Sequence, residues 1–159
     1  MTAAVLTVSD SSARGHRADL SGPAVKVALE RHKFHVIATA VVADQPSAIQ
    51  EAILEMASRA QLVVTTGGTG IAERDVTPEA TRAVCGRLVE GVAERMRAVG
   101  AQTTPLAALS RGVCGICGRA LVLNLPGSPQ AATESLTAVL DLLPHALDLL
   151  AGKTAHPGH

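Results

Sequence analysis

Short apolar runs alternate with amphipathic segments along the chain. Residues 3–8 and 62–66 are short, continuous and mostly apolar, and residues 34–42 are rich in β-branched types. The first pattern is typical of strands that are buried on both faces, and the second also favours a strand. Between them, apolar side chains recur at helical spacing, as in Ile49, Ile53 and Met56.

Prolines mark the predicted helix starts. Pro23 and Pro46 each stand in the first turn of a predicted helix, where the missing N–H costs no hydrogen bond. Pro78 does the same in a third helix, for which Thr77 is the predicted N-cap. A further short helix is predicted around Val92 and Met96 from their spacing.

The last third of the chain is predicted to form a strand pair and a helix. Residues 113–117 and 120–125 favour an antiparallel pair that turns at Gly118-Arg119, and residues 130–151 favour a helix broken near Pro144. We expect residues 1–152 to form one domain and residues 153–159 to form a flexible tail. Buried strands that alternate with helices predict an α/β fold, a three-layer α/β/α sandwich around a mostly parallel sheet.

Composition argues against several classes of protein. Fourteen basic residues balance fourteen acidic ones and Phe34 is the only aromatic residue, so a nucleic-acid or anionic membrane partner is not expected. The apolar fraction is 47%, but no apolar run approaches the roughly 20 residues of a membrane helix. The first residues lack the basic region and cleavage site of a signal peptide, and three cysteines are too few for a disulfide scaffold. We expect a cytoplasmic protein with reduced thiols.

Polar or glycine-rich segments follow the predicted strands. Ser9-Asp10, Asp44, residues 66–70 and residues 124–128 each stand at the end of a strand. In open parallel sheets, ligands bind beyond the carboxyl ends of the strands. We therefore expect these four segments to form one composite site.

The glycine loop Gly67-Gly68-Thr69-Gly70 is a candidate phosphate site. Glycine lets the backbone approach a ligand, so that successive N–H groups can converge on phosphate oxygens. The loop is followed by no Gly-Lys-Ser/Thr and has no dinucleotide-binding glycine pattern. A tight turn without a ligand is the alternative interpretation.

Asp75 lies a few residues beyond this loop. A carboxylate beside bound phosphate can hold Mg²⁺, which keeps most of its water ligands and bridges to phosphate oxygens. The alternative is that Asp75 caps the following turn, and spacing alone leaves both open. Asp44 is a weaker candidate because a lone Asp before Gln-Pro is typical of a loop.

Cys114 and Cys117 match the spacing of a redox pair only superficially. Such pairs work where the first cysteine begins a helix, whereas these two lie along a predicted strand. Residues three apart in a strand are about 10 Å apart and face opposite sides, which is beyond disulfide reach. We predict no redox role for this pair.

Five segments together resemble the signature blocks of the Mog/MoaB family of molybdenum cofactor biosynthesis, and of the gephyrin G domain. They occur in the family's order and spacing over residues 3–150. The blocks are Thr7-Val8-Ser9-Asp10-Ser11, Thr65-Thr66-Gly67-Gly68-Thr69-Gly70, Arg74-Asp75-Val76-Thr77-Pro78-Glu79-Ala80-Thr81, Leu109-Ser110-Arg111 and Asn124-Leu125-Pro126-Gly127-Ser128.

The resemblance implies a molybdopterin-binding α/β/α fold that assembles as a homotrimer. It also implies an enzyme, a molybdopterin adenylyltransferase, which uses Mg²⁺ and transfers AMP from ATP to the terminal phosphate of molybdopterin with release of pyrophosphate. A separate molybdate-insertion protein would then consume the adenylylated product.

The resemblance also assigns roles to residues of this chain. Asp75 resembles the acidic residue essential for adenylyl transfer, and Asp44 falls where the family has an Asp linked to metal and nucleotide. Both are the expected catalytic residues and Mg²⁺ ligands. The expected substrate-binding and nucleotide-binding residues are Ser9, Asp10, Thr66, Gly67, Gly68, Thr69, Gly70, Ser110, Asn124, Pro126, Gly127 and Ser128, of which Ser110 and Asn124 match positions implicated in holding the pterin and its phosphate.

Two residues depart from the family pattern. Cys117 stands where many relatives carry a basic residue, and Glu73 replaces a residue that is often Pro or Arg. If these side chains face the ligand, both changes weaken phosphate binding. The alternative function is therefore a catalytically weak molybdopterin-binding carrier, or a scaffold protein, of the same family.

Overall fold

A six-stranded sheet forms the centre of the fold. The computed structural model describes residues 1–153, and in it the strand order is β2-β1-β3-β6-β5-β4. Strands β2, β1, β3 and β6 are mutually parallel, and β5 runs antiparallel to both of its neighbours. The strands are β1 (Thr2–Val8), β2 (His35–Val42), β3 (Leu62–Thr66), β4 (Arg87–Leu88), β5 (Cys114–Cys117) and β6 (Ala120–Leu125).

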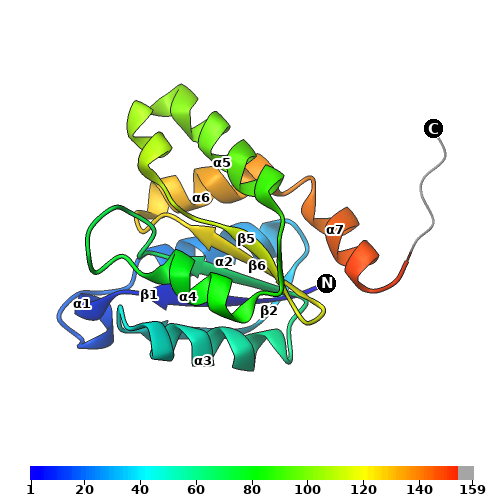
Figure 1. Ribbon diagram of the computed structural model, residues 1–159, viewed down its shortest axis with the longest axis horizontal. Helices are drawn as coiled ribbons and strands as arrows, with labels where there is room; N and C mark the ends of the chain where they lie inside the picture. The colour runs from blue at the N-terminus through cyan, green and yellow to red at the C-terminus, as the bar shows by residue number, and fades with distance from the viewer. Residues whose placement is uncertain (154–159) are drawn as a thin grey trace.

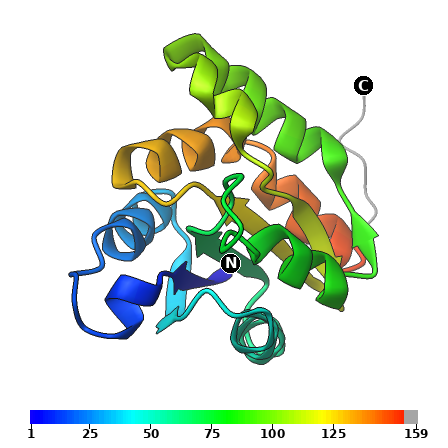
Figure 2. The same cartoon turned by 60° about the vertical axis from the view of Figure 1, so that its left-hand side comes forward.

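Helices cover both faces of the sheet, as Figures 1 and 2 show. One core cluster joins one face to α2, α5, α6 and α7, and a second joins the other face to α3 and α4. The predicted three-layer α/β/α sandwich with a mostly parallel sheet is therefore confirmed. The helices are α1 (Asp10–Ala13), α2 (Ser21–Arg31), α3 (Pro46–Ala57), α4 (Thr77–Val84), α5 (Glu90–Thr103), the 3₁₀ helix η1 (Pro105–Leu109), α6 (Pro129–Val139) and α7 (Leu143–Leu150).

The central strands are apolar along their length because both of their faces are covered. Ala4 and Leu6 of β1 join the cluster under α3, whereas Ala3 and Val5 join the cluster under α2. Strand β2 lies at the sheet edge and is only partly buried. The apolar content of β2 does not reveal this, because six of its eight residues are apolar although the strand lies at the edge.

Most elements begin and end close to their predicted positions. The proline-led helices and the hairpin at Gly118-Arg119 are confirmed, and the last helix is interrupted before Pro144. Helix α1, strand β4 and helix η1 were not predicted from the sequence. The prediction that Thr77 caps α4 is wrong, because Val76 is the N-cap and no side chain caps that helix.

Part of the predicted tail lies outside the described residues. This applies to residues 154–159, whereas Lys153 is described and its Nζ lies 3.0 Å from Oδ1 of Asp148. Within residues 1–153, no helix is long and apolar enough to cross a membrane.

The two cysteines of β5 face opposite sides of the sheet. Cys114 belongs to the core under α5 and α6, and Cys117 belongs to the core under α3 and α4. Both are free thiols, as is Cys85. The strand alternation predicted from the sequence is confirmed, and it separates Cys114 from Cys117.

Burial makes these thiols poor nucleophiles. Burial, with a smaller contribution from the neighbouring Cys85, raises the pKa of Cys114 to about 12, and burial also raises the pKa of Cys85 to about 11. At pH 8 a thiol with a pKa near 12 is ionised in only about one molecule in 10⁴.

We predict that Ellman's reagent modifies Cys85 slowly and Cys114 more slowly still in the folded protein, and all three thiols rapidly in urea. Fast native modification of Cys114, located by mass spectrometry, would contradict this packing.

Candidate active site

The carboxyl ends of the parallel strands lie along one edge of the sheet. Strand β1 ends level with β2, and β3 ends level with β6. Main-chain bonds continue past the strand ends: the N–H of Ser9 donates to the Val42 carbonyl at 2.9 Å, and the N–H of Gly67 donates to the Leu125 carbonyl at 3.1 Å. The four polar segments that the sequence places after strands are therefore neighbours in space.

Asp10 and Asp44 hold each other through reciprocal hydrogen bonds. The N–H of Asp10 donates to Oδ2 of Asp44, and the N–H of Asp44 donates to Oδ1 of Asp10, each at 2.9 Å. The pKa of the Asp44 carboxyl is raised overall, and burial is the largest cause. The charges of Asp10 and Asp75 also raise this pKa, whereas the hydrogen bond from the Asp10 N–H and the charge of Arg74 lower it. The carboxylates of Asp10, Asp44 and Asp75 and the guanidinium of Arg74 are therefore close together at this corner of the fold.

Gly67 and Gly68 make a left-handed turn directly after β3. Their φ angles are +94° and +67°, a region that favours glycine. A Cβ at Gly67 would collide with the Val8 carbonyl oxygen, and a Cβ at Gly68 would collide with the hydroxyl of Thr77 and lie 3.3 Å from Oδ1 of Asp44. Two glycines are required here because the loop passes directly against β1 and α4.

The hydroxyl of Thr77 is buried beside this turn. Thr77 is fully buried, and within residues 1–153 its Oγ1 has no hydrogen-bond partner. Buried hydroxyls normally have partners, because an unpaired one costs about 1–3 kcal/mol. This hydroxyl lies beside Gly68 and has no exposed surface, so it is enclosed by the protein itself.

Asp75 lies over the glycine loop. Its Oδ2 accepts a hydrogen bond from the N–H of Ala72 at 3.0 Å, and a Cβ at Gly70 would lie only 2.7 Å from the same oxygen. The carboxylate is half-buried and lines both cavities of the site. The predicted neighbourhood of Asp75 and the loop is thus present.

Two cavities meet at Gly68, Asp75 and Gly127, which line both. The first, here called the acidic cavity, has a volume of about 370 Å³ and is lined among others by Ser9, Asp10, Asp19, Asp44, Thr66, Gly67, Arg74 and Ser128. The second, the apolar cavity, has a volume of about 420 Å³ and is lined among others by Thr69, Gly70, Met96, Arg97, Leu106, Leu109, Ser110, Asn124, Pro126, Glu134 and Ser135.

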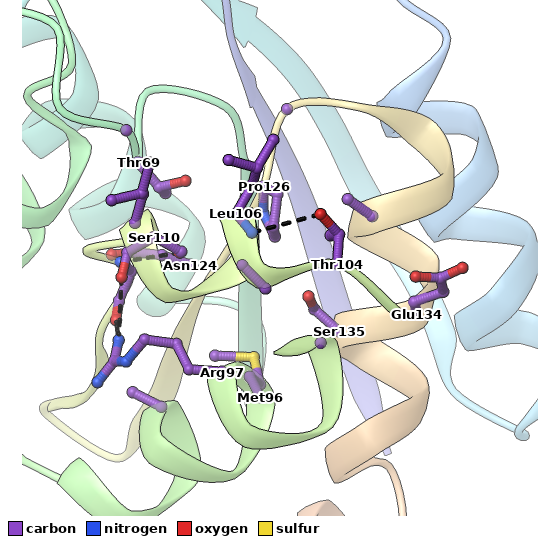
Figure 3. Close-up of a pocket in the computed structure, with 18 of the residues that line it drawn as sticks. Thr69, Met96, Arg97, Thr104, Leu106, Ser110, Asn124, Pro126, Glu134 and Ser135 are labelled. Carbon is purple, nitrogen blue, oxygen red and sulfur yellow. Dashed lines mark hydrogen bonds between the residues drawn. The ribbon is translucent and has the colours of Figure 1, made fainter. Parts of the chain in front are cut away.

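The apolar cavity has polar groups at two opposite ends (Figure 3). Thr69 and Ser110 lie at the end beside the glycine loop, and Glu134 and Ser135 of α6 lie at the other. Leu106 lies between these ends. Such an arrangement suits a flat ligand whose two ends are polar.

Several predicted site residues use their side chains within the protein. Asn124 Oδ1 accepts from the Val113 N–H, and its Nδ2 donates to the hydroxyls of Thr65 and Thr81. The Thr66 hydroxyl is 2.6 Å from that of Ser21. The hydroxyls of Ser9 and Ser128 accept N–H bonds at the starts of α1 and α6. These side chains shape the walls of the site, and their backbones border it.

The two departures from the family pattern lie away from the cavities. Cys117 is buried at the edge of the sheet opposite the site, paired with the first residue of β6, and Glu73 is exposed and lines neither cavity. The condition under which these two side chains would weaken phosphate binding, that they face the ligand, is therefore not met.

Sequence reasoning missed two residues that organise the site. Asp19 accepts hydrogen bonds from the Thr7 hydroxyl and the Gly22 N–H, and it lines the acidic cavity. Arg111 donates to three backbone carbonyls around the glycine loop. The one signal for Arg111 was its position directly after Ser110 in a signature block, and no pattern pointed to Asp19.

Comparison with known proteins gives a consistent picture. The model of the family described as "Probable molybdopterin binding domain" matches residues 4–145. The chain is 41% identical over 155 residues to the molybdopterin adenylyltransferase of Helicobacter pylori strain J99, covering 93% of this chain and 86% of that protein. It is 38% identical over 141 residues to the molybdopterin adenylyltransferase of Escherichia coli K12, covering 86% and 72%.

A solved structure agrees in fold as well as in sequence. The molybdopterin biosynthesis enzyme MoaB of Thermus thermophilus superposes with a TM-score of 0.90 at 51% identity, covering 96% of this chain and 97% of that one.

The turn at Gly68 provides a stability test with a matched control. Gly68→Ala is expected to lower the free energy of unfolding by about 2–4 kcal/mol, because it combines a left-handed backbone with the collision at Thr77. Gly118 has a similar φ of +61° and open space around it, so Gly118→Ala should cost only about 1–2 kcal/mol. Urea titration measures both, and equal losses would show that the contact with Thr77 contributes nothing.

Proposed function

Because the chain belongs to the family of molybdopterin-binding domains, we propose that it is a molybdopterin adenylyltransferase. The reaction transfers AMP from ATP to the terminal phosphate of molybdopterin and releases pyrophosphate. The observation that carries the proposal is the shared wall of the two cavities, where Asp75 and Gly68 border both. The two cavities adjoin at this shared wall, so two substrates bound one in each cavity would have their phosphates next to each other there.

We assign the acidic cavity to the triphosphate of ATP. It offers the hydroxyl-rich start of α1, the left-handed turn at Gly67-Gly68 and Arg74. The hydroxyls and the arginine suit phosphate oxygens, whereas the carboxylates there would repel phosphate unless a cation lies between them.

The donor set fits a Mg²⁺ ion in that position. Asp44 and Asp75 would hold it, because both line the acidic cavity and carboxylate oxygens are ligands that Mg²⁺ prefers. Residues 1–153 contain no group of three side chains arranged to hold a metal by themselves, but Mg²⁺ commonly uses only one or two carboxylates and keeps several waters. When bound, the ion would neutralise charge on the phosphates.

The chemistry then requires positioning more than proton transfer. The attacking phosphate of molybdopterin is already ionised at neutral pH, so no general base is needed. Its oxygen forms a bond to the α-phosphorus of ATP while the bond to the pyrophosphate oxygen breaks. The chain's contribution is to hold two anions in contact and to exclude water from the shared wall.

We assign the apolar cavity to the pterin. Leu106 and Met96 provide apolar contact for a flat ring, and the end beside Thr69 and Ser110 adjoins the wall where the phosphates would meet. At the far end, Glu134 offers carboxylate oxygens to the two N–H donors on the amino-pyrimidinone edge of a pterin.

The alternative of a weak molybdopterin carrier is not favoured. Its basis was the character of Glu73 and Cys117, and neither side chain lines a cavity. The homotrimer, the cytoplasmic location and a downstream molybdate-insertion protein stay predictions of the family resemblance.

Substitution of Asp75 tests the transfer step. In a single-turnover reaction with molybdopterin and Mg-ATP, Asp75→Asn should lower the rate of adenylylated pterin formation by about 100-fold to 1000-fold, because one charge at the shared wall is lost. Asp44→Asn should also lower it, by at least about tenfold. Asp141→Asn is the matched control, since it removes only an exposed ion pair with Arg95 and should leave the rate unchanged. Equal rates for all three variants would contradict the assignment.

Substitution of Glu134 tests the orientation of the pterin. Glu134→Gln keeps the side-chain shape but removes the charge, so the Kd of molybdopterin should rise about 10-fold to 100-fold, with little change in the rate at saturation. Glu51→Gln on α3, an exposed residue away from both cavities, is the control. Quenching of pterin fluorescence measures the affinity, and an unchanged Kd for Glu134→Gln would reverse the proposed orientation.

A further inference from the structure

The segment that carries Asp75 has few contacts of its own. Residues 71–74 are exposed, and the side chain of Ile71 is among the most exposed apolar groups of the protein, at 71%. The two bonds around its turn are local: the N–H of Asp75 donates to the Ala72 carbonyl, and the N–H of Ala72 donates to Asp75 Oδ2. These bonds shape the turn, but they do not fix it relative to the sheet.

Arg111 supplies that fixation from outside the segment. Its main-chain N–H donates to the Thr69 carbonyl at 2.8 Å, its Nε donates to the Gly70 carbonyl at 2.7 Å, and its Nη2 donates to the Asp75 carbonyl at 2.6 Å. Its Nη1 also donates to the carboxylate of Glu79 in the first turn of α4. The main-chain N–H of Thr77 also donates to the Gly68 carbonyl at 3.1 Å, just outside the segment, and Arg111 adds the bonds that join Gly70 to Asp75 within it.

Geometry makes this a role for arginine in particular. A guanidinium is planar and carries five N–H donors in a fixed fork, so a single side chain can bond three groups in set directions. The hydrogen bond from Arg111 lowers the pKa of the Glu79 carboxyl, which keeps that partner charged. A lysine ammonium would retain the charge but not the fork.

Arg111 does not face the substrates. It lines a third cavity, between α4 and α5, and it lines neither the acidic nor the apolar cavity. Direct contact with phosphate is therefore not its role in this geometry, although its charge alone would suggest one.

We propose that Arg111 is the positioning residue of Asp75. Its guanidinium closes the segment between Gly70 and Asp75, and this closure keeps the Asp75 carboxylate over Gly70 at the wall shared by the two cavities. Arg111 thus acts on the reaction through Asp75. The reaction itself rests on the proposed function, whereas the closure of the segment does not.

A double-mutant cycle separates action through Asp75 from independent action. Arg111→Met should lower the single-turnover rate at saturating substrates about 10-fold to 100-fold. Arg111→Lys should lower the same rate by a smaller factor. In the Asp75→Asn background, Arg111→Met should add less than a twofold loss. Affinity for molybdopterin should change less than threefold in every variant. If the fold losses of the two single variants multiply in the double variant, or if the rate of Arg111→Met is unchanged, the proposal is overturned.

Limited proteolysis tests the closure without reference to the reaction. Trypsin binds several residues of its substrate in an extended conformation, so cleavage after the exposed Arg74 requires the turn to open. Native Arg111→Met should therefore be cut there about tenfold faster than the wild type, and Arg111→Lys at an intermediate rate. Mass spectrometry identifies the fragment that ends at Arg74. Equal cleavage in the wild type and Arg111→Met would overturn the proposal.

The kinetic cycle and the proteolysis distinguish a failure of the proposed function from a failure of the role proposed for Arg111. A wild type that forms no adenylylated pterin would contradict the proposed function, and cleavage after Arg74 would still decide the role of Arg111. If Arg111→Met does not fold, Glu79→Gln and Arg111→Lys carry both measurements. Glu79→Gln leaves the guanidinium's bonds to the Gly70 and Asp75 carbonyls in place, and Arg111→Lys keeps the positive charge and the main-chain bond to Thr69. Unchanged cleavage and rate in both of these variants would then overturn the proposal.

Discussion

The parallel register of β1, β2, β3 and β6 is the constraint on which the site depends. Because these strands end level with one another, the chain must turn four times along one edge of the sheet. Each turn then lies against its neighbours, and the turn after β3 requires glycine at positions 67 and 68, because both φ angles are positive and a Cβ at either position would collide with a neighbouring segment. A dense core beneath this edge, with residues buried on both faces of β3 and β6, keeps the register fixed.

The register also brings several carboxylates close together at the ends of the strands, where their like charges repel one another. Asp10 and Asp44 follow β1 and β2, Asp75 lies in the loop after β3, and the charges of Asp10 and Asp75 both raise the pKa of Asp44. Like charges this close are unfavourable unless a cation or a protonation offsets them. A fold with no net charge nevertheless concentrates carboxylates at one corner, which is typical of a site for a cation together with the anion it bridges.

Local patterns in the sequence were sufficient for the sheet, the main helices and the floor of the site. Continuous apolar runs predicted the buried strands, and proline at the first turn predicted α3 and α4. Positions that depend on contacts between distant segments were not predictable in this way. Strand β4 has only two residues and exists because it pairs with β5, and Thr77 gives up the capping role that its type favours because its side chain packs beside Gly68.

The walls of the site show the same limit. Leu106 and Glu134 lie on different helices that meet only through packing around α5, so no spacing in the sequence indicates that they share a cavity. The bond between Arg111 and the Asp75 carbonyl joins residues 36 positions apart. The resemblance to a family located the blocks that contain Asp75 and Arg111, but not Leu106 or Glu134, and the physical role of each residue required the folded geometry.

The central claim is that the shared wall joins the α-phosphorus of ATP to the phosphate of molybdopterin. Parallel reactions with ATP labelled at the α-phosphate or at the γ-phosphate test it most directly. Adenylyl transfer predicts that the α label appears on the pterin and the γ label appears in pyrophosphate. A pterin that binds tightly but acquires neither label, or that acquires the γ label, would contradict the claim.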